Sequence, residues 1–166
     1  MSSCCFTGHR TYKMGINKDG LERLKNRLKE VIEKNIENGT DTFYTGMAEG
    51  VDLMAAAIIL DKKQEGADIR IIGVVPFKGQ ESRWSFEQQK EYNRILNLCD
   101  EVHILCEHYH SKCFFIRNEF MVDRSKRVIA IYNGDSGGTR YTVNYAIKKG
   151  VPVTCINPKN MEISEL

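Results

Sequence analysis

The 166-residue sequence has no long apolar run, and no segment approaches the roughly 20 apolar residues of a membrane-spanning helix. Its beginning, MSSCCFTGHR, lacks the charged and apolar regions of a secretory signal. Charge of one sign is also missing, because 24 basic residues nearly cancel 22 acidic ones. We therefore expect a cytoplasmic protein without a membrane segment. The balance also makes nucleic acid an unexpected partner, whereas a small anionic ligand needs only a local positive site.

The 6 cysteines favour reduced thiols over a disulfide framework, because the chain is longer than disulfide-rich scaffolds usually are. The segment CEHYHSKC offers a zinc site as the alternative, since Cys106, His108 and His110 would share one face of an extended segment, with Cys113 shortly after. Such alternation places side chains in line rather than around a tetrahedron. We therefore predict no metal and interpret the segment as a solvated loop with a partly buried thiol.

Extended and helical patterns alternate along the chain, as in a parallel sheet flanked by helices. The segment IRIIGVV is apolar on both faces, as a central strand must be, and we expect Pro76 to end it. Asp19 and Glu22 resemble a capping box at the start of the first helix. The sequence predicts a single domain over residues 1–166, an α/β Rossmann-like three-layer sandwich with a mostly parallel sheet of about six strands and helices on both faces. The expected strands are 3–7, 42–45, 69–75, 101–105, 127–132 and 151–156, and the expected helices begin near 19 and 86 or span 48–63, 115–122 and 138–149.

The stretch GDSGGT, residues 134–139, fits two signatures of serine hydrolases. A trypsin-like protease requires two β-barrels, which the alternation of strands and helices excludes. In the nucleophile-elbow fold the acid and the histidine follow the serine, whereas all 4 histidines here precede Ser136. We therefore interpret the stretch as a glycine-rich turn. Its backbone N–H groups and the dipole of the following helix would face a bound anion.

Two more glycine-containing loops follow predicted strands and open toward helices: TGHR, residues 7–10, and TGMAEGVD, residues 45–52. In a parallel sheet these loops leave the same carboxyl edge, where open α/β sheets bind ligands. Arg10 offers a planar fork to a phosphate, and His9 can hydrogen-bond phosphate or ribose oxygens. The loops together predict one phosphate-binding site.

Four segments, CCFTGHR, YTGMAEGVDLMAA, NEFMVDRS and IAIYNGDSGGTRYTVNYA, extend over nearly the whole chain in this order. As a set they resemble the YpsA-type (DUF1273) branch of the SLOG superfamily, which also contains the DNA-processing DprA proteins and the cytokinin-activating LOG enzymes. The resemblance implies a Rossmann-like fold with a nucleotide or nucleotide-derived ligand at the glycine loops, often in a homodimer. It implies no single reaction, because members range from enzymes to ligand sensors and DNA-binding proteins.

The glycine motif departs from that of the LOG enzymes, G-G-x-G-T-x-x-E, in which the glutamate is catalytic. Thr139 matches the motif threonine, but Thr142 stands in place of the glutamate and cannot act as a carboxylate. The acids in or beside the candidate loops that offer a substitute are Glu49, Asp52, Glu119, Asp123 and Asp135. Glu49 and Asp52 are the catalytic candidates among them, and their alternative role is to complement the dipole of the second helix. Asp52 binding a ribose hydroxyl is a third interpretation.

Aromatic and amide side chains complete the expected site. Phe77 and Trp84 offer faces that stack on a base, with a core or dimer contact as the alternative. Asn118 and Asp123 either point toward the same edge or cap and pack their short helix. The expected ligand-binding residues are Thr7, Gly8, His9, Arg10, Thr45, Gly46, Glu49, Gly50, Asp52, Phe77, Trp84, Asn118, Asp123, Gly134, Asp135, Gly137, Gly138 and Thr139.

From these residues we expect a protein that binds a nucleotide, NAD or ADP-ribose-like phosphate ligand, requires no cofactor, and acts as a sensor or regulatory module. The first alternative is a hydrolase that cleaves an N-glycosidic or phosphate bond of such a ligand. The second is DprA-like binding of single-stranded DNA, which the balanced charge disfavours because backbone contacts need several Lys or Arg along a groove.

Overall fold

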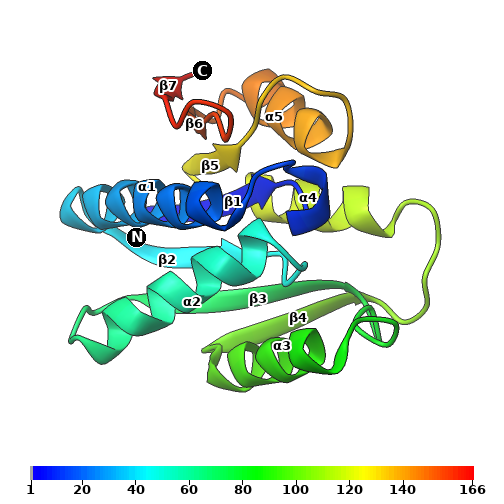
Figure 1. Ribbon diagram of the computed structural model, residues 1–166. Helices are drawn as coiled ribbons and strands as arrows, with labels where there is room; N and C mark the ends of the chain where they lie inside the picture. Colours follow the sequence, from blue (N-terminus) through cyan, green and yellow to red (C-terminus); the bar gives the residue numbers. More distant parts are fainter. Residues whose placement is uncertain (1) are drawn as a thin grey trace.

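The computed structural model describes residues 2–166 and contains a seven-stranded sheet with the strand order β4-β3-β2-β1-β5-β6-β7 (Figure 1). The neighbouring strands from β4 to β6 pair in parallel, and β7 pairs antiparallel with β6. The strands are β1 (Ser2–Gly8), β2 (Thr40–Thr45), β3 (Arg70–Phe77), β4 (Glu101–Cys106), β5 (Arg127–Ile131), β6 (Val153–Ile156) and β7 (Ile163–Glu165). The helices are the short η1 (Thr11–Lys13) and α1 (Lys18–Glu37), α2 (Val51–Gln64), α3 (Phe86–Leu98), α4 (Cys113–Asp123) and α5 (Gly138–Lys148).

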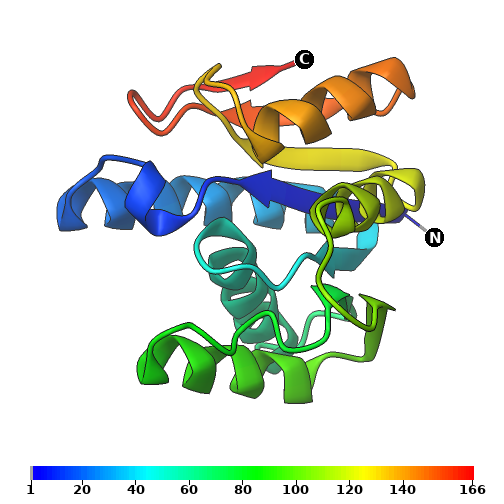
Figure 2. The ribbon, with the colours of Figure 1, turned by 90° about the vertical axis from the view of Figure 1, so that its right-hand side faces the viewer.

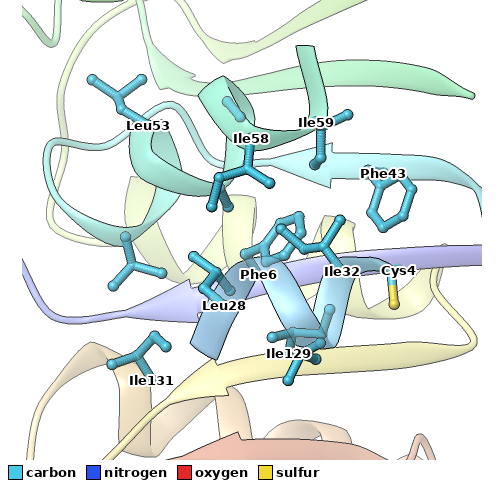
Figure 3. Packing of buried hydrophobic residues seen from close by; sticks show 14 of the residues in the cluster. Cys4, Phe6, Leu28, Ile32, Phe43, Leu53, Ile58, Ile59, Ile129 and Ile131 are labelled. Atoms are coloured by element: carbon cyan, nitrogen blue, oxygen red, sulfur yellow. The ribbon is translucent and has the colours of Figure 1, made fainter. Parts of the chain in front are cut away.

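The helices form two layers, with α1, α2 and α3 on one face of the sheet and α4 and α5 on the other (Figures 1 and 2). Each face has its own apolar core, because successive residues of a strand point to opposite faces. On β1, Phe6 belongs to the core beneath α1–α3 and Cys5 to the core beneath α4 and α5. Figure 3 shows Leu28 and Ile32 of α1 close to Phe6 in the first core. The predicted three-layer sandwich is confirmed.

Helix α1 begins after Asn17, whose side-chain oxygen accepts a hydrogen bond from the N–H of Gly20 at 2.8 Å. The predicted capping box of Asp19 and Glu22 is wrong, because Asp19 already lies in the first helical turn. Leu24, Leu28 and Ile32 then follow at the spacing of one helix face and are fully buried.

Strand β3 continues through Pro76 to Phe77, so the prediction that Pro76 ends the strand is wrong. Phe77 is still in register with Cys106 of β4, and the N–H of Lys78 donates to the Cys106 carbonyl at 3.1 Å. Pairing beyond the proline therefore holds the strand together, although proline itself donates no ladder hydrogen bond.

The sequence prediction missed β7, which extends the sheet beyond the six predicted strands. The strand is three residues long and exposed, so it carries no readable periodicity. Its position is fixed by Glu165, whose carboxylate accepts hydrogen bonds from Arg127 at 2.6 Å and Thr154 at 2.8 Å. The chain thus ends on an added strand rather than on β6.

Two other expectations concern the whole chain. All six cysteines are free thiols, as predicted. Within residues 2–166, none of the helices combines the length and the apolar character that crossing a bilayer requires.

Candidate functional site

A pocket of about 620 Å³ lies at the carboxyl edge of the sheet, beside the end of β1 and the start of α5. Strand β1 is the point where the strand order reverses, because β2, β3 and β4 follow on one side and β5 and β6 on the other. Open α/β sheets bind ligands at this switch point, where diverging loops leave a crevice. The predicted ligand residues that line the pocket are Thr7, Gly8, His9, Arg10, Asp52, Asn118, Gly137, Gly138 and Thr139.

The start of α5 gives the pocket a set of free backbone donors. Gly137 precedes the helix with φ of 136°, a conformation that favours glycine, and it provides no side-chain cap for the first turn. Gly138 is the first helical residue, and a Cβ built on it would meet no atom within 4 Å. Packing within the chain therefore does not require glycine at position 138. The open space belongs to the pocket, which Gly138 lines.

Three other glycines of the predicted loops are explained by packing or backbone conformation within the chain. A Cβ on Gly8 would lie 2.5 Å from Val51 Cγ2, and a Cβ on Gly46 would lie 2.6 Å from both Arg117 Nη1 and Asp52 Oδ2. Gly50 has φ of 99°, and a Cβ there would lie 2.8 Å from the carbonyl oxygen of His9. Helix α2 consequently begins at Val51 rather than at the predicted residue 48.

A buried acid and a buried arginine lie close together in the lining of the pocket. Asp52, in the first turn of α2, is 6% exposed, and Arg117 of α4 is also 6% exposed. Burial raises the pKa of Asp52, while the nearby Arg117 and the backbone N–H of Ala48 act against this shift. Burial likewise lowers the pKa of Arg117. Arg117 donates to the carbonyl of Gly46 and to Asn118 Oδ1, at 2.7 Å for the latter.

Two guanidinium groups flank one aromatic ring of the pocket. The Arg10 guanidinium carbon lies 5.8 Å from the centroid of the Phe114 ring, and that of Arg117 lies 5.7 Å from it. The charge of Arg10 also lowers the pKa of Arg117, since like charges repel. Phe115 and Tyr141 add a second aromatic contact, with ring centroids 4.4 Å apart. The pocket therefore combines positive charge with flat apolar faces.

The structure places several expected ligand residues outside the pocket lining. Trp84 packs edge-on against Tyr92, and Phe77 packs edge-on against Phe114 with centroids 5.9 Å apart, so Phe77 supports a lining residue. Asp123 accepts a hydrogen bond from the Tyr145 hydroxyl at 2.8 Å. These contacts correspond to the packing roles that the sequence had left as alternatives.

The remaining predicted residues shape the loops around the pocket. Thr45 donates to the Asp52 carbonyl at 3.0 Å, and Glu49 accepts from the N–H of Thr11 at 3.3 Å. Gly134 and Asp135 belong to the exposed segment before α5, and Asp135 is held there by a hydrogen bond from its N–H to Asn133 Oδ1. These contacts hold the chain at its turns.

Ser136 is exposed and lies outside the pocket lining. Thr142, at the position of the LOG glutamate, is fully buried and donates to the Gly138 carbonyl at 2.9 Å. Neither hydroxyl therefore faces the pocket.

Several lining residues were not predicted from the sequence, and three of them, Phe114, Phe115 and Arg117, lie on α4. This helix had been identified from its apolar residues, which concealed that Phe114 and Arg117 face the pocket. An arginine within an apolar helix, directly followed by asparagine, was the available signal, since buried charges require polar partners. The missed lining residues are Phe6, Lys13, Ala48, Ser111, Phe114, Phe115, Arg117 and Tyr141.

The segment CEHYHSKC, residues 106–113, does not continue as an extended strand. Cys106 ends β4, the chain turns, and Cys113 begins α4. The ligand atoms of Cys106, His110 and Cys113 lie within 4.8 Å of one another, and His108 is not among them.

Comparisons with known proteins identify the family of this chain. Residues 4–161 match the family model YpsA, described as the YspA SLOG family. The chain belongs to this family. It is 34% identical over 139 residues to the SPbeta prophage-derived protein YoqJ of Bacillus subtilis (strain 168), covering 76% of this chain and 81% of YoqJ. It is 28% identical over 156 residues to a UPF0398 protein of Bacillus thuringiensis (strain Al Hakam), covering 90% of this chain and 85% of that protein.

Solved structures of DNA processing protein A (DprA) share the fold of this SLOG-family chain. The Streptococcus pneumoniae protein superposes with a TM-score of 0.64 at 18% identity, and the Helicobacter pylori protein with 0.64 at 16% identity. Each superposition covers 94% of this chain, but only 50% of the first DprA chain and 65% of the second. The Helicobacter pylori structure concerns the single-stranded DNA binding mode of that DprA.

Proposed function

We propose that the pocket binds a nucleotide-derived phosphate ligand, of the nucleotide, NAD or ADP-ribose class, and that the protein acts as a sensor or regulatory module. The observation that carries this proposal is the open space at Gly138 beside the uncapped start of α5. Four N–H groups at a helix start lack partners within the helix, and the helix dipole favours a negative charge there. A phosphate group can use both.

The rest of the pocket fits the other parts of such a ligand. Arg10 and Lys13 supply further positive charge at the lining, and Arg10 presents a planar fork that pairs with phosphate oxygens. The rings of Phe115 and Tyr141 offer faces on which a base can stack. A volume of about 620 Å³ lies within the range of small-molecule sites.

Thermal unfolding of the purified protein with AMP, ADP, NAD, ADP-ribose and inorganic phosphate tests the proposal. We expect at least one nucleotide to stabilise the wild type by about 2.7 kcal/mol at a hundredfold excess over its dissociation constant. Gly138→Asp should abolish this stabilisation, because the new carboxylate fills the space and repels phosphate. Ser136→Asp is the matched control, since it adds the same charge two residues away and outside the lining.

A second pair of variants tests the positive charge. Arg10→Ala should weaken binding, and Arg23→Ala, an exposed arginine of α1, should leave binding unchanged. The proposal is contradicted if no phosphate compound stabilises the wild type, or if folded Gly138→Asp responds as strongly as Ser136→Asp.

Hydrolysis of the bound ligand is the second candidate function, and Asp52 is the observation in its favour. This acid is buried, lines the pocket, and has a raised pKa, a combination typical of general acids and bases. Slow turnover of the bound nucleotide that disappears in Asp52→Asn, with binding retained, supports a hydrolase. Turnover equal in the wild type and in Asp52→Asn excludes Asp52 as its acid or base.

Single-stranded DNA binding rests on the shared fold with DprA and on the positive lining of the pocket. A fluorescent oligonucleotide measured in parallel separates it from nucleotide binding. Displacement of the oligonucleotide by a mononucleotide assigns both ligands to this pocket. Tight oligonucleotide binding without any response to mononucleotides favours the DprA-like function instead.

A further inference from the structure

Two thiols and one imidazole lie close together at the end of β4. The function proposed for the pocket does not use them. Cys106 is the last residue of β4, His110 lies in the following loop, and Cys113 is the first residue of α4. Cys106 Sγ and His110 Nε2 are 3.4 Å apart, and the three ligand atoms all lie within 4.8 Å of one another. The three residues lie within the continuous stretch 106–113, and the turn from β4 into α4 brings their side chains together.

These separations suit one shared tetrahedral ion. Ligands about 2.3 Å (sulfur) and about 2.0 Å (nitrogen) from a zinc ion lie roughly 3.5 to 3.8 Å from each other. Small side-chain rotations therefore bring the three atoms into contact with one ion. Two thiolates and an imidazole form the ligand chemistry that soft and borderline cations such as Zn²⁺ prefer.

The surroundings of Cys113 suit a sulfur that binds a metal ion. Its sulfur lies at the start of α4, where the helix dipole stabilises negative charge. The backbone N–H of His110 also donates to Cys113 Sγ at 3.1 Å. Hydrogen bonds from N–H groups that do not themselves bind the metal stabilise a metal-bound sulfur.

We propose that Cys106, His110 and Cys113 bind one Zn²⁺ ion, with water or an external ligand in the fourth position. Among residues 2–166, no fourth His, Cys, Asp or Glu joins this group of ligand atoms. Three protein ligands with one open position is the arrangement of exchangeable zinc sites.

Zinc binding has a local structural consequence. The N–H of Lys112 donates to His110 Nδ1 at 3.2 Å, whereas a zinc ion at Nε2 requires the ring proton on Nδ1. This neutral hydrogen bond must open when zinc binds, and the loop from 107 to 112 must adjust. Ser111 of that loop lines the pocket, so zinc occupancy changes the wall of the ligand site.

Cobalt titration of the full-length protein, reduced and stripped of metal with a chelator, tests this proposal. We expect one Co²⁺ per chain with a thiolate-to-cobalt absorption band and visible bands of tetrahedral cobalt, all removed by one equivalent of Zn²⁺. Cys106→Ser and His110→Ala should weaken zinc binding at least about tenfold, consistent with the loss of one ligand. His108→Ala is the matched control, because its ring is outside the cluster.

Hydrogen exchange provides a second readout that does not depend on colour. Zinc should change amide exchange in residues 107–112 of the wild type and of His108→Ala, but not of His110→Ala. The proposal is overturned if the reduced wild type binds no cobalt or zinc. It is equally overturned if binding and exchange are the same in the folded His110→Ala and His108→Ala variants.

Discussion

At the scale of single residues, Gly8 and Gly138 both line the pocket, but for different physical reasons. Gly8 brings β1 against Val51 at the start of α2, whereas Gly138 faces open space. The sequence shows the same residue type after a strand in both cases. Only the arrangement of the neighbouring helix separates a glycine needed for packing from one that leaves room for a ligand.

Alanine substitution distinguishes the two glycines. Gly8→Ala should lower the free energy of unfolding by about 1 to 3 kcal/mol, because the new methyl group would lie 2.5 Å from Val51 Cγ2. Gly138→Ala meets no atom within 4 Å and should change stability by less than about 1 kcal/mol. Urea unfolding monitored by circular dichroism measures both. Equal losses in the two variants would contradict this distinction.

Asp52 makes stability depend on pH in a defined direction. Burial raises its pKa above the ordinary value of 3.8, so the folded state holds the proton more tightly than the unfolded state. The stability from this group is therefore complete below the unfolded pKa and is lost as pH rises through the folded pKa. The side-chain amide of Asp52→Asn does not titrate, so this variant lacks the contribution of Asp52 to the pH dependence.

The unfolding free energy of the wild type relative to that of Asp52→Asn should accordingly fall as pH rises above about 4. Urea unfolding of both proteins across a pH series that begins near pH 4 measures it. A difference that stays constant, or that moves in favour of the wild type, means that the folded-state pKa of Asp52 is not raised.

At the scale of elements, the ends of helices and strands depend on contacts that sequence periodicity does not contain. The apolar stripe of α1 predicted the helix, but Asn17 rather than Asp19 provides its cap. Likewise the pairing of β3 with β4 carried the strand past Pro76. Periodicity identifies the face that is buried. The hydrogen bonds at the ends of an element depend instead on which groups the folded chain places beside them.

Substitution at the start of α1 tests the assigned cap. Asn17→Ala should cost about 1 kcal/mol, because the N–H of Gly20 loses its partner. Asp19→Ala removes only a dipole contact worth about 0.3 kcal/mol at an exposed position. Thermal unfolding of both variants compares them. A larger loss for Asp19→Ala would restore the capping box predicted from the sequence.

At the scale of the whole molecule, the near-balance of charge contrasts with the local excess at the pocket. The lining contains Arg10, Lys13 and Arg117 against the single acid Asp52. If single-stranded DNA binds only there, three phosphate contacts give a slope of about −2 in a plot of log K against log salt concentration. Fluorescence anisotropy over a salt series measures this slope. A much steeper dependence would require a basic surface beyond the pocket.

The site could be predicted from the sequence only in part. Its loops have recognisable turn residues, whereas its helix α4 resembles an ordinary core helix. The glycine loops are visible, since turns at strand ends have characteristic residues, and nine of the expected residues line the pocket. The residues of α4 are not, because Phe114 has the same apolar character as its core neighbours. Trp84 and Asp123 were predicted to bind a ligand because their side chains suit one. In the structure Trp84 packs against Tyr92, and Asp123 accepts a hydrogen bond from Tyr145.

Both ends of the described chain lie at the edge of the sheet opposite the pocket. Ser2 begins the parallel strand β1, and Leu166 exchanges backbone hydrogen bonds with Val153, the first residue of β6. Strand β7 produces this arrangement, because its antiparallel direction returns the chain from the carboxyl edge. A biotin tag at either terminus would therefore anchor the molecule to a sensor chip with its pocket open to the flowing analyte.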